Sequence, residues 1–123
     1  MPAILVVDDD TEFSGLVSGH FTGLGYKVIL AHDGKEGLEK AAALKPDIIF
    51  LDIMMPDMNG IEVLRELRAD DDTSHIPVVV MTAKFFDSSM TELFTQESNC
   101  REFLSKPVEL SHLQQKTEAL LKK

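Results

Sequence analysis

The chain has 123 residues and a mass of 13.7 kDa, the size of one domain, and it can bury roughly two thirds of the surface that the unfolded chain exposes. Its 12 basic and 21 acidic residues give a net charge of −9, which excludes nucleic-acid binding through the overall electrostatic field and favours cations or basic protein surfaces as partners. No apolar run approaches the ~18 residues of a membrane span, and the N-terminus lacks a basic signal-peptide region. These two features predict a chain that is not inserted in a membrane. Cys100 is the single cysteine, so we expect no internal disulfide and a cytoplasmic location.

Five short apolar segments alternate with segments of helical periodicity. The predicted strands cover residues 3–7, 26–31, 48–51, 76–81 and 102–105. The second, third and fourth are rich in Val, Ile and Phe, which is typical of buried strands. The last is short and partly polar, which is typical of an edge strand.

Helices are predicted between the strands, because apolar residues recur there at intervals of three and four. They lie around residues 13–24, 33–45, 59–67, 86–94 and 108–121. Asp33 with Glu36 forms a capping pair at the start of the second helix, and Asn59 with Glu62 repeats that pair at the start of the third.

Strands that alternate with helices predict a three-layer α/β/α fold with a parallel sheet. In such a fold the functional crevice lies at the carboxyl ends of the strands, where the strand order reverses. The residues that follow the first, third, fourth and fifth predicted strands are Asp8, Asp9, Asp10, Asp52, Thr82, Ala83, Lys84 and Lys106. The sequence therefore predicts carboxylates, a hydroxyl and an ammonium group in one crevice.

The carboxylates predict a metal site. Asp8, Asp9 and Asp52 would lie close together, and like charges at such distances require a cation or raise one another's pKa. A set of oxygen ligands without His or Cys favours Mg²⁺, with Mn²⁺ as an alternative. The competing interpretation is a solvated acidic loop, and Asp10 is expected only to cap the first helix.

The remaining crevice residues suit phosphoryl chemistry. Asp52 at a strand end is a nucleophile toward phosphorus when a metal ion lies alongside. Lys106 can pair with Asp52 and then with a phosphoryl oxygen, and Thr82 offers a hydroxyl to the same oxygens. Pro107 follows Lys106, so a cis peptide bond is possible there.

These residues resemble the receiver domain of two-component response regulators, the CheY-like superfamily. The matching segments are ILVVDD at 4–9, DIIFLDIMMP at 47–56 with NG at 59–60, PVVVMTA at 77–83 and FLSKP at 103–107. They occur in the right order along nearly the whole chain, and as a set they are specific although each alone is weak. The resemblance implies a doubly wound, flavodoxin-like five-stranded sheet of order 2-1-3-4-5. We expect a single receiver domain over 1–123 with no effector domain in this chain, either as a stand-alone receiver or as one piece of a larger regulator or hybrid kinase.

The resemblance also implies roles for individual residues. Asp52 is the phosphoacceptor; Asp9, Asp52 and the main-chain carbonyl of Met54 ligate Mg²⁺ directly, and Asp8 acts mostly through water. Lys106 contacts the phosphoryl group, Thr82 moves toward it, Phe103 turns inward with that threonine, and Ala83 keeps the site open.

The implied function is phosphorylation on Asp52 that switches a face built from the fourth helix, the fifth strand and the last helix. The implied partners are a sensor histidine kinase or histidine phosphotransfer protein and a downstream target protein. The domain would not be an enzyme beyond promoting its own phosphorylation and dephosphorylation.

Four alternatives are weaker than the receiver interpretation. An FMN module needs a loop of hydroxyls and amides after the first strand, and a Rossmann site needs G-x-G-x-x-G; Gly15, Gly19 and Gly23 are instead interpreted as close packing of the first helix. A haloacid-dehalogenase-type phosphatase carries a second Asp two residues after its nucleophile, where this chain has Met54. A degenerate receiver that only binds proteins does not need the complete set of Asp, Thr and Lys.

The sequence departs from the common receiver pattern before the fifth strand. The family usually has Gly-Ala there, and this chain has Glu97-Ser-Asn-Cys-Arg101. Asn99 tolerates left-handed backbone, so the turn is expected to survive. The stretch between Thr82 and Lys106 is about two residues longer than usual, which affects the fourth helix rather than the site.

Overall fold

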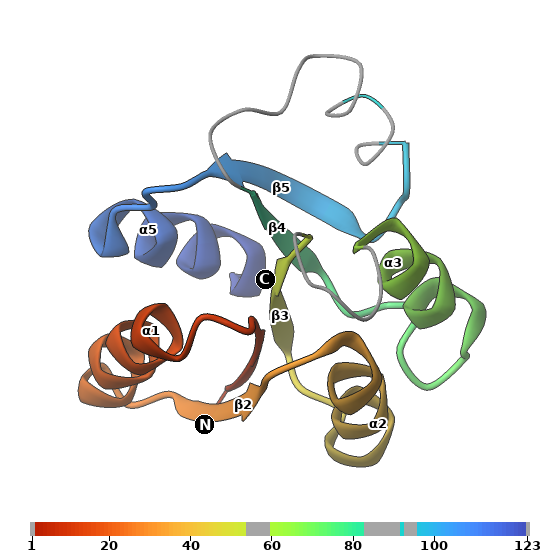
Figure 1. The fold of residues 1–123 in the computed structure, drawn as a ribbon, viewed down its shortest axis with the longest axis horizontal. Coiled ribbons are helices and arrows are strands. Elements are labelled where there is room, and N and C mark those ends of the chain that lie inside the picture. The colour runs from red at the N-terminus through yellow and green to blue at the C-terminus, as the bar shows by residue number, and fades with distance from the viewer. Residues whose placement is uncertain (1, 54–59, 83–91, 93–95, 123) are drawn as a thin grey trace.

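A computed structural model describes residues 2–53, 60–82, 92 and 96–122 of the chain. Its five strands form one parallel sheet of order β2-β1-β3-β4-β5 (Figure 1), which is the predicted order. The strands are β1 (Ala3–Val7), β2 (Lys27–Ala31), β3 (Ile48–Asp52), β4 (Val78–Thr82) and β5 (Cys100–Ser105). The sheet order reverses between β1 and β3, which are direct neighbours, so the crevice is expected at their carboxyl ends.

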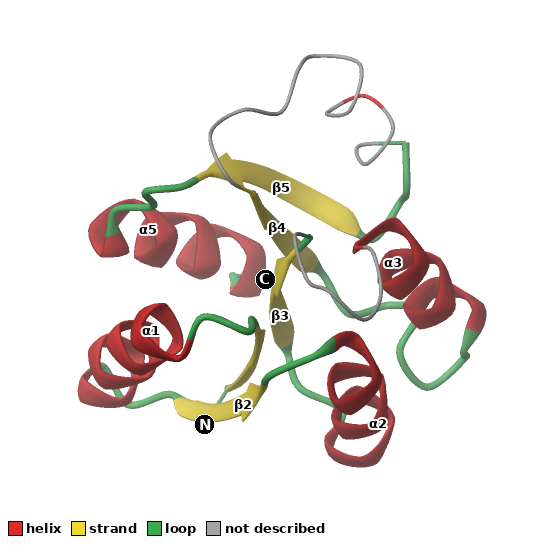
Figure 2. Cartoon of the chain, viewed as in Figure 1, coloured by secondary structure: helices red, strands yellow, loops and turns green. Residues whose placement is uncertain are grey.

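Helices cover both faces of the sheet. The described helices are α1 (Thr11–Gly23), α2 (Gly34–Leu44), α3 (Gly60–Ala69) and α5 (Leu110–Leu121). Figures 1 and 2 show α1 and α5 on one face of the sheet and α2 and α3 on the other. The predicted helix around 86–94 lies outside the described residues except for Glu92, which is helical. No helix among the described residues has the length and apolarity needed to cross a membrane.

The core has two layers because successive residues of a strand point to opposite faces of the sheet. Leu5 and Ile49 contribute to the layer under α2 and α3, whereas Val6 and Phe50 contribute to the layer under α1 and α5. Phe21 of α1 packs edge-on against Phe50, with 5.4 Å between the ring centroids. All residues of β3 and β4 are buried, which explains their continuous apolar sequence.

Two helix starts follow the predicted capping residues, whereas Asn59, the predicted cap of the third helix, lies outside the described residues. The Asp10 carboxylate accepts hydrogen bonds from the main-chain N–H groups of Glu12 and Phe13, so Asp10 caps α1. Asp33 accepts from the N–H of Glu36 at 2.7 Å, and Glu36 accepts in turn from the N–H of His32. Both interactions satisfy main-chain donors that have no partner inside the helix.

The strand boundaries differ from the predicted ones by one or two residues. β2 begins one residue later than predicted and β4 two residues later, because the polypeptide enters the sheet only where a neighbouring strand can pair with it. β3 extends one residue further, to Asp52. β5 begins two residues earlier, at Cys100, which pairs with Val78.

The expected turn before β5 is present, with the N–H of Cys100 donating to the carbonyl of Glu97 at 3.0 Å, but Asn99 contributes to it differently from the prediction, and the interpretation of the α1 glycines was wrong. Among the described residues Lys45 is the one non-glycine residue with a positive φ, of 46°, so Asn99 does not adopt left-handed backbone. Asn99 instead inserts its buried side chain toward α3 and donates to the carbonyl of Leu64 at 3.0 Å. Gly15, Gly19 and Gly23 do not mediate close packing, since a Cβ atom at each would have no neighbour within 4 Å.

Gly60, at the start of α3, is a glycine that packing does require. A Cβ atom there would overlap the side chain of Ile53, the residue that follows Asp52. The absent side chain therefore lets the first turn of α3 lie directly against the end of β3.

Candidate functional site

Three aspartates meet at the carboxyl ends of β1 and β3. Asp52 is the last residue of β3 and 4% exposed, Asp8 follows β1 and is fully buried, and Asp9 is exposed. One carboxylate oxygen from each lies within 4.8 Å of those from the other two. The predicted clustering of Asp8, Asp9 and Asp52 is therefore found, with two members inside the protein and one facing solvent.

Main-chain hydrogen bonds fix the strand ends from which these side chains project. The N–H of Asp8 donates to the carbonyl of Ala31 on β2 at 3.0 Å. The N–H of Lys106, which follows β5, donates to the carbonyl of Thr82 at 2.6 Å. The peptide bond between Lys106 and Pro107 is cis.

Among the described residues, Lys106 supplies the positive charge at the site. Its Nζ lies 2.9 Å from Oδ2 of Asp8 and 3.4 Å from Oδ2 of Asp52, and its side chain is 22% exposed. One ammonium group therefore bridges the two buried carboxylates, and the longer distance to Asp52 marks the weaker of its two hydrogen bonds.

The pKa values of this pair reflect burial. Burial raises the pKa of Asp8 from 3.8 to about 6, although hydrogen bonds from the Lys106 ammonium and the N–H of Asp10 oppose the change, and the nearby charge of Asp52 adds to it. Burial alone would lower the pKa of Lys106, but its hydrogen bond to Asp8 and the charge of Asp52 raise it above 10.5. Lys106 is therefore charged at neutral pH, whereas Asp8 begins to take up a proton at a higher pH than an ordinary aspartate does.

Thr82 lies on β4, the neighbour of β3, and Phe103 lies on β5, the neighbour of β4. Thr82 ends β4, is fully buried, and its hydroxyl has no hydrogen-bond partner among the residues that the structure describes. Phe103 pairs with Val80 in the sheet register and packs, partly buried, against the core layer under α2 and α3. Ala83 and Met54, the other two predicted site residues, lie outside the described residues.

Phe13 belongs to the site, and sequence reasoning missed it. The Nζ of Lys106 lies 4.6 Å from the centroid of the Phe13 ring, a distance typical of a cation–π contact. The sequence pattern placed Phe13 only on the apolar face of the first helix. The available signal was its position one turn after Asp9, which places it at the end of α1 that faces the strand ends.

The donor set fits a hard divalent cation. All three carboxylates offer oxygen, and Asp10 is not part of the set because its carboxylate caps α1. Asp8 already accepts from the ammonium of Lys106 and from the N–H of Asp10 at 2.9 Å. The exposed Asp9 is therefore better placed than the buried Asp8 to ligate an ion directly.

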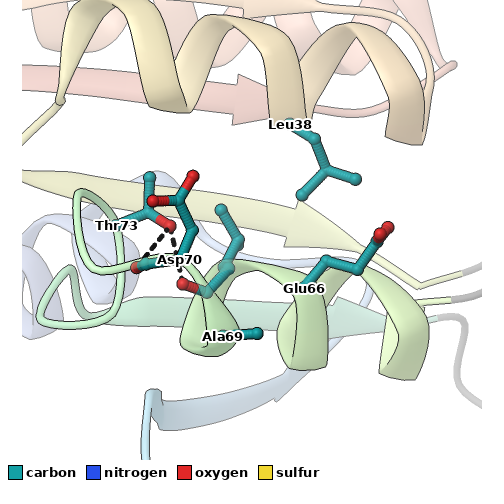
Figure 3. Close-up of a pocket in the computed structure, with 6 residues that line it drawn as sticks. Leu38, Glu66, Ala69, Asp70 and Thr73 are labelled. Carbon is teal, nitrogen blue, oxygen red and sulfur yellow. Dashed lines mark hydrogen bonds between the residues drawn. The ribbon is translucent and has the colours of Figure 1, made fainter.

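A cavity of about 330 Å³ lies elsewhere, between α2 and α3 (Figure 3). Leu38 lies on its α2 side, and Glu66 and Asp70 lie on its α3 side. The Thr73 hydroxyl at its wall donates to the carbonyl of Leu67 at 2.6 Å. The described residues that line this cavity include no cation, so its carboxylates lack the ammonium group that accompanies the carboxylates at the strand ends.

Comparison with known proteins decides the family. The family model of the response regulator receiver domain matches residues 4–118. The chain belongs to this family. Because a flavodoxin-like sheet also occurs in FMN modules, the family match rather than the sheet order sets aside the FMN, Rossmann and phosphatase alternatives.

Similar proteins are found by sequence and by structure. The receiver domain is 37% identical over its whole length to the DNA-binding dual master transcriptional regulator RpaA of Synechocystis, and 39% identical over 98% of its length to response regulator MprA of Mycobacterium ulcerans. It spans about half the length of these relatives, 50% in both cases. Among solved structures, a putative response regulator from Chloroflexus aurantiacus superimposes with a TM-score of 0.90 at 26% identity, each chain covered completely. The receiver domain of Francisella response regulator 1452 gives a TM-score of 0.87 at 30% identity, with 99% of this chain and 98% of the other covered.

Proposed function

We propose that this receiver domain accepts a phosphoryl group on Asp52 from a sensor histidine kinase or a histidine phosphotransfer protein. The observation that carries the proposal is the position of Asp52, which is 4% exposed at the end of β3 with the ammonium of Lys106 at 3.4 Å. A carboxylate in this position is held for attack, and a lysine beside it can neutralise charge on an incoming phosphoryl group.

The transfer is a displacement at phosphorus. An Asp52 carboxylate oxygen forms the new P–O bond, and the P–N bond to the histidine of the donor breaks. The bonding electrons leave with the imidazole nitrogen, and protonation of the imidazole completes its departure. Lys106 then turns from the Oδ2 atom of Asp52 to a phosphoryl oxygen, while its shorter hydrogen bond to Asp8 at 2.9 Å keeps it in the crevice.

We propose Mg²⁺ as the cofactor, with Mn²⁺ as a substitute. Asp9, Asp52 and the main-chain carbonyl of Met54 would hold it directly, and Asp8 would contact it mostly through water. The bound ion supplies positive charge that offsets the three carboxylates and the phosphoryl oxygens. The buried position of Asp8 and its bond to Lys106 support its indirect role.

The aspartyl phosphate is proposed to be long-lived, so the domain signals rather than turning over a substrate. Residue 54 is Met and offers no acid–base group two positions after Asp52. The domain then promotes only its own phosphorylation and dephosphorylation.

The proposed output is a change on the face that contains β5, α5 and the segment between β4 and β5. Thr82 has a buried hydroxyl that a phosphoryl oxygen can engage, and movement of Thr82 toward the site would leave space that Phe103 can fill. Ala83, directly after Thr82, is a small residue that would leave the phosphoryl group accessible. The net charge of −9 favours a target protein rather than nucleic acid as the direct partner of this face.

The experiment is phosphorylation by acetyl phosphate or phosphoramidate in Mg²⁺, followed by intact-mass spectrometry. We expect one base-labile phosphoryl group in the wild type and none in Asp52→Asn. Asp71→Asn, in the exposed loop after α3, is the matched control and should be phosphorylated as the wild type is. A phosphoryl adduct that persists in Asp52→Asn would refute the assignment.

A further inference from the structure

Phe13 occupies an unusual place beside the ammonium of Lys106. The ammonium faces the carboxylates of Asp8 and Asp52 at 2.9 and 3.4 Å, and the centroid of the Phe13 ring lies 4.6 Å from the same nitrogen. The negative face of an aromatic ring attracts a cation without ligating a metal ion and without accepting a conventional hydrogen bond. The ring therefore attracts Lys106 without competing with it for the carboxylate oxygens.

The ring is fixed by the same short segment that carries the acidic residues. The N–H of Phe13 donates to the Asp10 carboxylate at 3.1 Å, and the N–H of Asp10 donates to the Asp8 carboxylate at 2.9 Å. The Phe13 side chain also packs, partly buried, against the core layer under α1 and α5. These contacts hold the ring in a defined place relative to Asp8, so Lys106 is positioned by one rigid unit at the start of α1.

We propose that Phe13 is a positioning residue for the phosphoryl-transfer step, because its ring holds the Lys106 ammonium over Asp52 before and after the phosphoryl group arrives. This inference rests on the proposed function of Asp52. When Lys106 exchanges the 3.4 Å contact with Asp52 for a phosphoryl oxygen, the ring provides an attraction that does not have to break. A side chain that only filled the core would provide packing but no such attraction.

The test compares Phe13→Leu with Phe13→Tyr. Leucine keeps an apolar side chain and removes the aromatic face, whereas tyrosine keeps the face. With acetyl phosphate and Mg²⁺, we expect the phosphorylation rate of Phe13→Leu to fall about 3- to 10-fold, the size of a partly buried cation–π contact, and that of Phe13→Tyr to stay within about twofold of the wild type. Leu16→Ala, on the same helix but 60% exposed, is the matched control and should leave the rate unchanged.

A second measurement does not depend on phosphorylation. The ε-methylene protons of Lys106 should show an upfield ring-current shift by NMR in the wild type and in Phe13→Tyr, and should lose it in Phe13→Leu. If wild-type Asp52 is not phosphorylated but this pattern is found, the proposed function fails while the ring contact stands. An unshifted Lys106 signal in the wild type overturns the inference. So does an unchanged phosphorylation rate in Phe13→Leu, or an equal loss of rate in Phe13→Leu and Phe13→Tyr, which would indicate a packing defect.

Discussion

Asp8 and Lys106 lie 98 residues apart in the sequence, and the Lys106 ammonium donates to the fully buried Asp8 carboxylate at 2.9 Å. The pair joins the end of β1 to the end of β5 across the centre of the sheet. A buried carboxylate with one cationic partner only partly recovers the hydration that it loses, which is why the pKa of Asp8 remains raised. The acidic site therefore strains the metal-free fold, and this has measurable consequences.

The first consequence is a dependence of stability on pH. Because the folded pKa of Asp8 is about 6 and its ordinary value is 3.8, the folded state binds this proton more tightly than the unfolded state does. The contribution of Asp8 to the free energy of unfolding is thus largest below pH 4 and falls as pH rises to 6, by about 3 kcal/mol in total. The raised pKa of Lys106 adds stability that is lost only above pH 10.5, outside this window.

Urea unfolding without metal, at several pH values between 4 and 7, measures this effect. Other carboxylates contribute slopes of their own, such as Glu36, whose pKa is lowered chiefly by the N–H of His32. The quantity to compare is therefore the difference in the free energy of unfolding between wild type and Asp8→Asn. As pH rises from 4 to 7, the wild type should lose stability relative to the variant. A difference that does not change with pH would contradict the raised pKa of Asp8.

The second prediction concerns magnesium. Binding of Mg²⁺ to the folded state alone stabilises it by mass action, and about 10 mM Mg²⁺ with a millimolar dissociation constant contributes about 1.4 kcal/mol. The melting temperature of the wild type should rise by several degrees in Mg²⁺. Asp9→Ala should lose most of this response and should be as stable as the wild type, or more so, without metal, because one repelling charge is gone. Asp71→Asn serves as the control, and a wild type that does not respond to Mg²⁺ would argue against a metal site.

The third prediction separates stability from switching at Thr82. Its hydroxyl is buried without a hydrogen bond to any residue in the described part of the chain. Burial of an unpaired hydroxyl is unfavourable, so Thr82→Val should raise the free energy of unfolding by about 1 kcal/mol in the absence of phosphoryl groups. The same variant should show smaller NMR shift changes on β5 when beryllofluoride is added. Lower stability together with full-sized shift changes would contradict both roles.

The fourth prediction concerns Asn99, which precedes β5. Its side-chain amide donates to the main-chain carbonyl of Leu64 in α3 at 3.0 Å and is buried. Asn99→Ala removes this donor and leaves a buried carbonyl unpaired, so chemical denaturation should show a loss of about 1 to 3 kcal/mol. Ser98→Ala, at the exposed neighbouring position, is the control. A loss of stability that is equal in the two variants would mean that the bond to α3 contributes nothing.

The parts of the fold that were predictable are those that local chemistry determines. Alternation of apolar segments with helical periodicity gave five strands, and Asp10 and Asp33 could be identified as caps because a cap interacts with residues two or three positions away. The clustering of Asp8, Asp9 and Asp52 was also predictable, since parallel strands bring their carboxyl ends to one edge. Periodicity and strand topology are thus sufficient for the scaffold and for the acidic residues.

The parts that were missed depend on packing between distant segments. The contact of Phe13 with Lys106 needs the relative positions of α1 and β5, which no local pattern specifies. Asn99 was interpreted through its backbone, whereas its role is a side-chain hydrogen bond to α3. The glycines of α1 were interpreted as packing residues although they face open space, because a glycine spacing does not reveal which side of a helix is covered.

The main-chain hydrogen bonds at the strand ends have a consequence for protein engineering. The N–H of Asp8 is held by Ala31, and the N–H of Lys106 is held by Thr82, in both cases through carbonyl oxygens that every amino acid supplies. The side chains that project from these positions can therefore be exchanged while the backbone that carries them stays in place. The backbone of the crevice can therefore serve as a scaffold for design, in which other combinations of acidic, hydroxyl and cationic side chains are introduced to bind different oxyanions or hard metal ions.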